Sequence, residues 1–174
     1  MKKAAIIIAL CVVTIAIASC NRVESPSTVA GLSRPAAISY VTHGAKVIDD
    51  SSKQQLETTL AALKERKKID FSIVTVATTG DKSARDYSLT LARERKSNRN
   101  DETVVAGLLL LIAVEDRTWH IQISNNLEAD LTQEVLTNLS TPMTDAFRQK
   151  HYSEGIIKYV NALIGKLEPL KPSK

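Results

Sequence analysis

The sequence predicts an α/β fold in which helices flank a mixed β-sheet with a central antiparallel hairpin, Val104–Ser124. The first arm, Val104–Val114, carries no charge and is apolar on both faces, which is typical of a strand covered on both sides. A polar turn follows, and Trp119–Ser124 then alternates between apolar and polar residues. Upstream, a strand, a helix and the first arm follow one another across residues 71–114, as in a right-handed parallel crossover.

The elements before this crossover are short. We expect edge strands at Ile38–Val41 and Val47–Ile48, followed by a helix that opens in Asp49–Ser52. Ser52 and Gln55 have the spacing of a capping box. Leucines then recur at helical spacing, and the helix ends in a positively charged stretch that suits its macrodipole.

The remaining elements follow from composition and helix signals. We expect a second core strand at Phe71–Thr78 and a helix at Lys82–Lys96. After the hairpin, Thr132 is predicted to cap a helix within residues 127–140, and Pro142 to restart a helix because proline suits a first helical position. The last helix starts near Ser153, so one domain spans about residues 36–168.

Residues 1–19 have the pattern of a lipoprotein signal peptide. Lys2 and Lys3 precede an apolar run that is short for a spanning helix, and the run ends Ile17-Ala18-Ser19-Cys20. This ending resembles the bacterial lipobox and predicts that Cys20 carries the lipid anchor, palmitate among its acyl chains. Asn21 then suggests the outer membrane, facing the periplasm, in a host with two membranes. The alternatives, an uncleaved anchor or an ordinary signal peptide, also place the domain outside the cytoplasm.

Charge and cysteine usage exclude several classes of function. The net charge of +4 falls to +2 without the leader, and no long basic run is interleaved with aromatic residues, which argues against nucleic acid as a partner. Cys11 lies in the leader and Cys20 is the acyl acceptor, so the mature domain has no thiol for a disulfide, a metal or catalysis. Residues 20–35 are expected to be a flexible tether, and residues 169–174 a C-terminal tail.

A series of short motifs resembles the TPM domain family over about residues 45–167. In chain order these are Val47-x-Asp49, Ile73–Val76, Gly107–Leu110, Ile121-x-Ile123, Leu127-Glu128, Pro142, Phe147, Tyr152 and Gly155-Ile156. The resemblance implies a Rossmann-like three-layer α/β sandwich, usually tethered to a membrane. It also implies one of three activities: acid phosphatase activity, calcium binding, or assembly or repair of membrane protein complexes.

The sequence departs from the family pattern near the expected site. Ser124-Asn125-Asn126 replaces a usual Gly-x-Gly, Ala106 replaces an asparagine, and the polar stretch Arg95–Glu102 replaces a loop with tryptophan. Asparagine, like glycine, enters the left-handed backbone region, so we expect Asn125 and Asn126 to keep the turn while narrowing the space beside it. Together these changes argue against an inherited catalytic or metal site.

Loop carboxylates form a first candidate site, for Ca²⁺ or Mg²⁺. Hard cations take oxygen ligands, and ligands of parallel sheets gather where the strands end. If the strand before Asp49 runs parallel to the strand before Asp81, then Asp49, Asp50, Asp81 and Asp116 share one end of the sheet. There they could hold a metal that orients phosphate. The alternative is structural, with the first three capping helices and Asp116 occupying the hairpin turn.

The loop after the hairpin is the second candidate site. It contains Asn125, Asn126, Glu128 and Asp130, and it follows an antiparallel strand, so it should lie at the opposite end of the sheet beside residues 98–102. Glu128 is either a ligand or a residue that orders the loop. The basic stretch Arg93–Lys96 is a solvated helix end that could also contact an acidic partner or lipid headgroups.

From these features we expect a non-enzymatic accessory at the cell envelope, anchored through Cys20 and binding a protein partner in the assembly or quality control of a membrane complex. The alternatives are a divalent-cation-dependent phosphatase and a calcium-binding module without turnover. Three or more converging carboxylates would favour the enzyme, whereas scattered capping carboxylates would favour the accessory.

Overall fold

The computed structural model describes residues 39–98 and 102–170, which contain a four-stranded sheet flanked by four α-helices. The strands are β1 (Val41–His43), β2 (Ile69–Val76), β3 (Ala106–Ala113) and β4 (Thr118–Ile123). The helices are α1 (Asp50–Lys67), α2 (Ala84–Asn98), α3 (Gln133–Arg148) and α4 (Tyr152–Leu167). The strands lie in the order β1-β2-β3-β4, parallel except for the β3–β4 hairpin, so the predicted mixed α/β sheet is confirmed.

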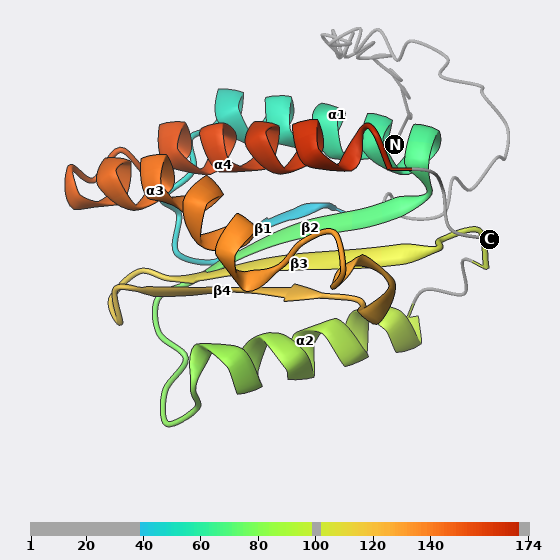
Figure 1. Ribbon diagram of the computed structural model, residues 1–174. Helices are drawn as coiled ribbons and strands as arrows, with labels where there is room; N and C mark the ends of the chain where they lie inside the picture. The colour runs from blue at the N-terminus through green and yellow to red at the C-terminus, as the bar shows by residue number, and fades with distance from the viewer. Residues whose placement is uncertain (1–38, 99–101, 171–174) are drawn as a thin grey trace, which may run out of the picture. The chain divides into compact units, whose positions relative to one another are not determined.

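The two apolar faces of β3 are buried in two separate hydrophobic clusters. Leu108, Leu110 and Ile112 belong to the large cluster beneath α1 and α4. Leu109 and Leu111 point to the other face, where they pack with Val74 against α2. Figure 1 shows the resulting layers, with α1, α3 and α4 on one side of the sheet and α2 on the other. The uninterrupted apolar run therefore reflects cover on both faces, as predicted.

Two predictions about the start of the domain are wrong. Val47 and Ile48 form no strand, because Lys46 adopts a left-handed backbone (φ 51°) and its N–H bonds back to the carbonyl of His43, which turns the chain out of the sheet. The edge strand beside β2 is instead β1, whose Val41 pairs with Ile73. Part of the edge strand predicted at residues 38–41 lies outside the described residues. The cap of α1 is Asp49, which accepts from the Ser52 N–H at 2.8 Å, rather than a capping box at Ser52.

The predicted helix restart at Pro142 is also wrong, because α3 continues through this residue. Pro142 is exposed, so water can bond to the carbonyl four residues earlier that loses its N–H partner. The predicted N-cap of α3 is confirmed, since the Thr132 hydroxyl accepts from the Val135 N–H at 3.4 Å. No helix in the described part of the chain is both long and apolar enough to cross a bilayer.

Three helices end on the same side of the domain. We call this side the amino end, because β2 and β3 begin there, and we call the opposite side the carboxyl end. α1 leads directly into β2, and α2 is the helix that precedes β3 in the chain. The Lys67 Nζ donates to the carbonyls of Glu168 and Leu170, which brings the end of α4 beside the end of α1. Figure 1 shows all three helices ending at the right, with the end of α2 on the opposite face of the sheet from the ends of α1 and α4.

Tyr159 of α4 places a hydroxyl in the core without a hydrogen-bond partner. Its side chain is fully buried, and its ring meets Trp119 edge-on at a centroid distance of 5.8 Å. Among the described residues no donor or acceptor reaches the hydroxyl, and burial raises the pKa of Tyr159. An unpaired polar group in an apolar core opposes folding.

Replacing Tyr159 with phenylalanine should therefore stabilise the domain by about 1 to 3 kcal/mol, because the ring contact remains and the unpaired hydroxyl is removed. Urea unfolding followed by circular dichroism measures this change. The control is Tyr152→Phe, which alters a half-buried ring packed on Phe147 and should leave stability nearly unchanged. A loss of stability in Tyr159→Phe would show that the hydroxyl has a partner in solution.

Candidate functional site

The aspartates predicted as metal ligands lie near the carboxyl end. Asp49 accepts hydrogen bonds from the Ser51 hydroxyl at 2.6 Å and from the N–H and hydroxyl of Ser52, both at 2.8 Å. The hydroxyls of Ser153 and Ser51 and the N–H of Ser52 hold the pKa of Asp49 well below its usual value. This carboxylate is engaged in holding the start of α1.

Asp116 joins the hairpin turn to the loop after β2. Its carboxylate accepts from the Thr79 N–H at 2.7 Å, the Thr78 hydroxyl at 2.8 Å and the Thr79 hydroxyl at 3.0 Å. The Thr79 N–H, followed by the Thr78 hydroxyl, lowers the pKa of Asp116. Asp81 is exposed and follows Gly80, whose left-handed backbone (φ 63°) makes the turn at this loop.

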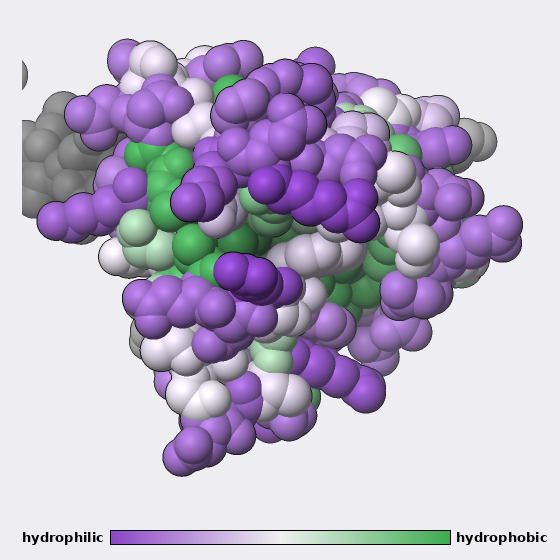
Figure 2. All heavy atoms as spheres, turned by 90° about the vertical axis from the view of Figure 1, so that its left-hand side faces the viewer, coloured by the Kyte–Doolittle hydropathy of each residue, from purple (hydrophilic) through white to green (hydrophobic). Residues whose placement is uncertain are grey.

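These four aspartates do not converge. Within residues 39–98 and 102–170, no group of three or more His, Cys, Asp or Glu side chains is placed to hold a metal ion. Figure 2, which views the carboxyl end, shows hydrophilic side chains around an apolar hollow between the helix layers. Binding of Ca²⁺ or Mg²⁺ stays a prediction. It can be tested by titrating the domain with each cation and by comparing phosphomonoester hydrolysis by the wild type and by Asp49→Asn.

The loop after β4 lies at the amino end, as its position after an antiparallel strand predicts. It forms a 3-10 turn, Asn125–Leu127, which is closed by a hydrogen bond from the Leu127 N–H to the Ser124 carbonyl at 2.9 Å. The expectation of a left-handed backbone at Asn125 and Asn126 is wrong, because neither residue has a positive φ. A right-handed turn needs no glycine, so this loop keeps a defined shape without the Gly-x-Gly.

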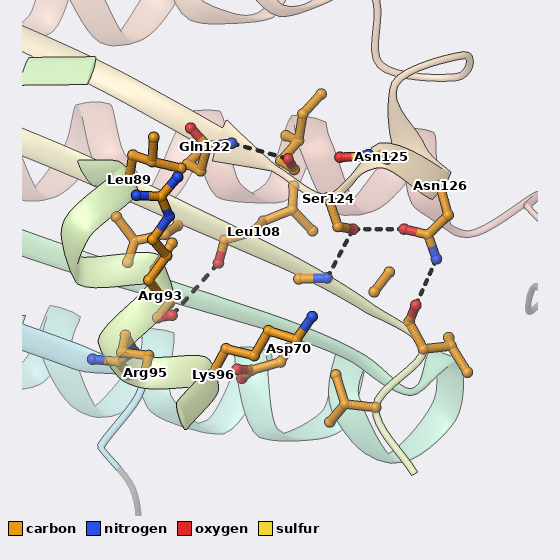
Figure 3. Close-up of a pocket in the computed structure, with 18 of the residues that line it drawn as sticks. Asp70, Leu89, Arg93, Arg95, Lys96, Leu108, Gln122, Ser124, Asn125 and Asn126 are labelled. Carbon is orange, nitrogen blue, oxygen red and sulfur yellow. Dashed lines mark hydrogen bonds between the residues drawn. The ribbon is translucent and has the colours of Figure 1, made fainter. Parts of the chain in front are cut away.

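Side-chain hydrogen bonds tie this loop to the start of β3. The Ser124 hydroxyl accepts from the Gly107 N–H at 3.1 Å and donates to the Asn126 amide oxygen at 2.6 Å. The Asn126 amide nitrogen donates to the Val105 carbonyl. Figure 3 shows these bonds along one wall of a groove. Ser124 and Asn126, which stand where the family resemblance leads us to expect glycines, therefore build the wall.

The groove runs between the C-terminal part of α2 and the strands β3 and β4, and its volume is about 1060 Å³. Its floor is largely apolar and includes Leu89, Ala92 and Leu109. Its polar lining comes from the α2 end, the start of β2, the segment before β3 and the loop after β4. These residues are Asp70, Ser72, Arg93, Arg95, Lys96, Glu102, Gln122, Ser124, Asn125 and Asn126.

The cationic side of the groove comes from the stretch Arg93–Lys96. Arg93 and Lys96 are exposed, whereas Arg95 is half-buried and has a buried Nε without a hydrogen-bond partner among the described residues. Burial lowers the pKa of Arg95, and the negative charge of Glu57 partly opposes that shift. The groove thus presents positive charge beside an apolar floor.

Arg95 and Glu57 also fix the point at which the chain enters the sheet. Arg95 donates to the Ser39 carbonyl at 3.0 Å. The Glu57 carboxylate accepts from the Ser39 hydroxyl at 2.6 Å and from the N–H groups of Tyr40 and Val41, both at 2.9 Å. The pattern of apolar residues gives no signal for this arrangement, because each bond joins residues far apart in the sequence.

The second candidate site is only partly assembled around this groove. Asn125, Asn126 and Glu102 line it, whereas Glu128 and Asp130 are exposed and lie outside the lining. Asp50 is exposed in the first turn of α1. The groove therefore offers amides, hydroxyls and cations more than it offers carboxylate ligands.

Acid should weaken the Asp116 contact. The carboxylate has a lower pKa in the folded domain than in the unfolded chain, where the value is near 3.8, so its bonds stabilise the fold fully above that pH and are lost as the pH falls through the folded-state pKa. Asp116→Asn should therefore lower the melting temperature by roughly a few degrees at pH 7 and by less near pH 2. Calorimetry at both pH values measures this, and an equal loss at both would contradict it.

Comparison with known proteins places this geometry in a family. The model of the TPM domain matches residues 41–166. None of the curated proteins compared with the chain matches it. The solution structure of the N-terminal domain of a protein from P. gingivalis superposes with a TM-score of 0.64 at 25% identity, covering 78% of this chain and 87% of that one.

Two further solution structures share the fold at 16% identity. The BA42 protein from Bizionia argentinensis has a TM-score of 0.59 and is matched over 73% of this chain and 86% of that one. The N-terminal domain of cg2496 from Corynebacterium glutamicum has a TM-score of 0.55, over 83% and 88%. Since the family model spans the whole sheet, α1 to α3 and all but the last residue of α4, the chain belongs to the TPM domain family.

Proposed function

We propose that this chain is a lipid-anchored accessory of the cell envelope whose TPM domain binds an acidic segment of an envelope protein in the groove at the amino end. The observation that carries the proposal is the combination of an apolar floor with two exposed cations of α2, Arg93 and Lys96. A protein segment with carboxylates beside apolar side chains complements both features.

The size and walls of the groove favour a peptide over a small metabolite. Its volume of about 1060 Å³ lies at the upper limit of the roughly 300–1,000 Å³ typical of small-molecule pockets. Gln122, Ser124 and Asn125 supply amide and hydroxyl groups that can bond to a peptide backbone. The hydrogen bonds of Ser124 and Asn126 hold this wall in place before a partner arrives, which reduces the entropy lost on binding.

The carboxylates at the carboxyl end support a structural role there. Asp49 is bonded to serines at the start of α1, and Asp116 is bonded to Thr78 and Thr79. A cation would have to compete with these bonds. For this reason we favour the accessory over a cation-dependent phosphatase or a calcium module.

Site-specific photo-cross-linking tests the groove. A photoreactive amino acid at Asn125, an exposed lining residue, should cross-link to an envelope protein in cells, whereas the same group at the exposed Lys150 should not. Arg93→Glu should weaken binding of the identified acidic segment by about tenfold, since it reverses a charge that faces the ligand. Arg85→Glu, an exposed change on the same helix outside the groove, is the matched control. Equal effects of the two variants would refute the site.

Acylation tests the anchor independently. Cells supplied with labelled palmitate should transfer label to the wild-type chain and not to Cys20→Ser, because serine lacks the thiol that accepts the acyl chain. The labelled protein should fractionate with the outer membrane in a host with two membranes. Label in Cys20→Ser, or none in the wild type, would contradict the anchor without affecting the groove.

A further inference from the structure

We infer that the amino end of the domain lies against an anionic phospholipid surface, so that the groove opens beside the bilayer. We call this surface the basic end. Its cations are Lys64, Arg66, Lys67, Lys68, Arg93, Arg95, Lys96 and Lys166. The inference rests on the proposed function in taking the lipid on Cys20 as the membrane anchor, and the basic end shares Arg93, Arg95 and Lys96 with the groove.

The cations gather because three helices end at this side. The last turns of α1, α2 and α4 each contain basic residues. The carboxylates at this side are Glu57, Glu65, Asp70, Glu94, Glu102 and Glu168, six against eight cations. Glu168 pairs with Arg66 at 2.8 Å, and Glu65 lies 4.0 Å from the Lys68 Nζ. Lys68, Lys96 and Lys166 are exposed, one on each helix end, so positive charge reaches solvent across the whole surface. Clustered lysines near an anionic bilayer each contribute about 1 kcal/mol, roughly fivefold in binding.

The point of chain entry selects a membrane as the occupant. The described chain begins at Ser39, which is fixed at this side of the domain by Arg95 and Glu57. Eighteen residues separate Ser39 from Cys20, a span of at most about 65 Å. An anchor joined to the domain at its basic end brings that end closest to the headgroups, and a short connection raises their effective concentration. Weak electrostatic contacts are then sufficient to orient the domain.

Vesicle flotation of residues 21–174 tests the surface without the lipid. The solution structures of isolated domains that match this chain indicate that such a domain folds alone. The wild-type chain should float with phosphatidylglycerol vesicles at low salt, should not float with phosphatidylcholine vesicles, and should be released by 0.5 M NaCl because salt screens the contacts.

Two triple variants of equal net charge locate the contact. Lys68→Glu/Lys96→Glu/Lys166→Glu should reduce affinity for the anionic vesicles on the order of a hundredfold. Lys46→Glu/Lys82→Glu/Lys150→Glu, also at exposed lysines but toward the carboxyl end, should reduce it by less than about threefold, because those charges lie beyond a Debye length. Circular dichroism confirms that both variants fold.

Three outcomes would overturn the inference: equal losses in the two variants, equal binding to both lipids, or no flotation of the wild-type chain. Binding of a polyglutamate peptide without vesicle binding would assign the basic end to an acidic protein instead. Palmitate labelling is read separately, so failure of the anchor and failure of the lipid surface are distinguishable.

Discussion

The structure depends on the need to bury both faces of β3. Leu110 and Leu111 are adjacent in sequence and both fully buried, yet they belong to clusters on opposite sides of the sheet. A strand of this kind requires a helix layer on each side. Once both faces are covered, a ligand can reach the sheet only at its edges and its two ends. The amino end and the carboxyl end are therefore the parts of the sheet that helices do not cover.

The two ends use their charges differently. At the carboxyl end, carboxylates accept hydrogen bonds from nearby backbone and hydroxyl groups, as Asp49 and Asp116 do, and so hold loops in place. At the amino end, basic side chains lie in the last turns of α1, α2 and α4, where they also interact favourably with the helix dipoles. Only some of them are then paired, as Arg66 is with Glu168 at 2.8 Å. The amino end therefore presents exposed positive charge at Arg93, Lys96 and Lys166.

The sequence predicts the fold well and the site only in part. Periodicity finds both core strands, the hairpin and all four helices, because these depend on which side of each element is apolar. It fails at Val47–Ile48 and Pro142, where a left-handed Lys46 and an exposed helix face override the local signal. The sequence also places the Asn125–Asn126 loop at the correct end of the sheet, because this loop follows a strand that runs antiparallel to its neighbour. It does not find the Glu57–Ser39 contact, which joins residues 18 positions apart through polar atoms alone.

Arg95 links the groove to the path of the chain. Its guanidinium lines the groove and also donates to the Ser39 carbonyl, while the neighbouring Glu57 bonds to the two residues that follow. One wall of the groove and the first described residues of the chain, Ser39–Val41, are thus held by the same pair of opposite charges. Arg95 therefore connects the lining of the groove to the point at which the described chain enters the sheet.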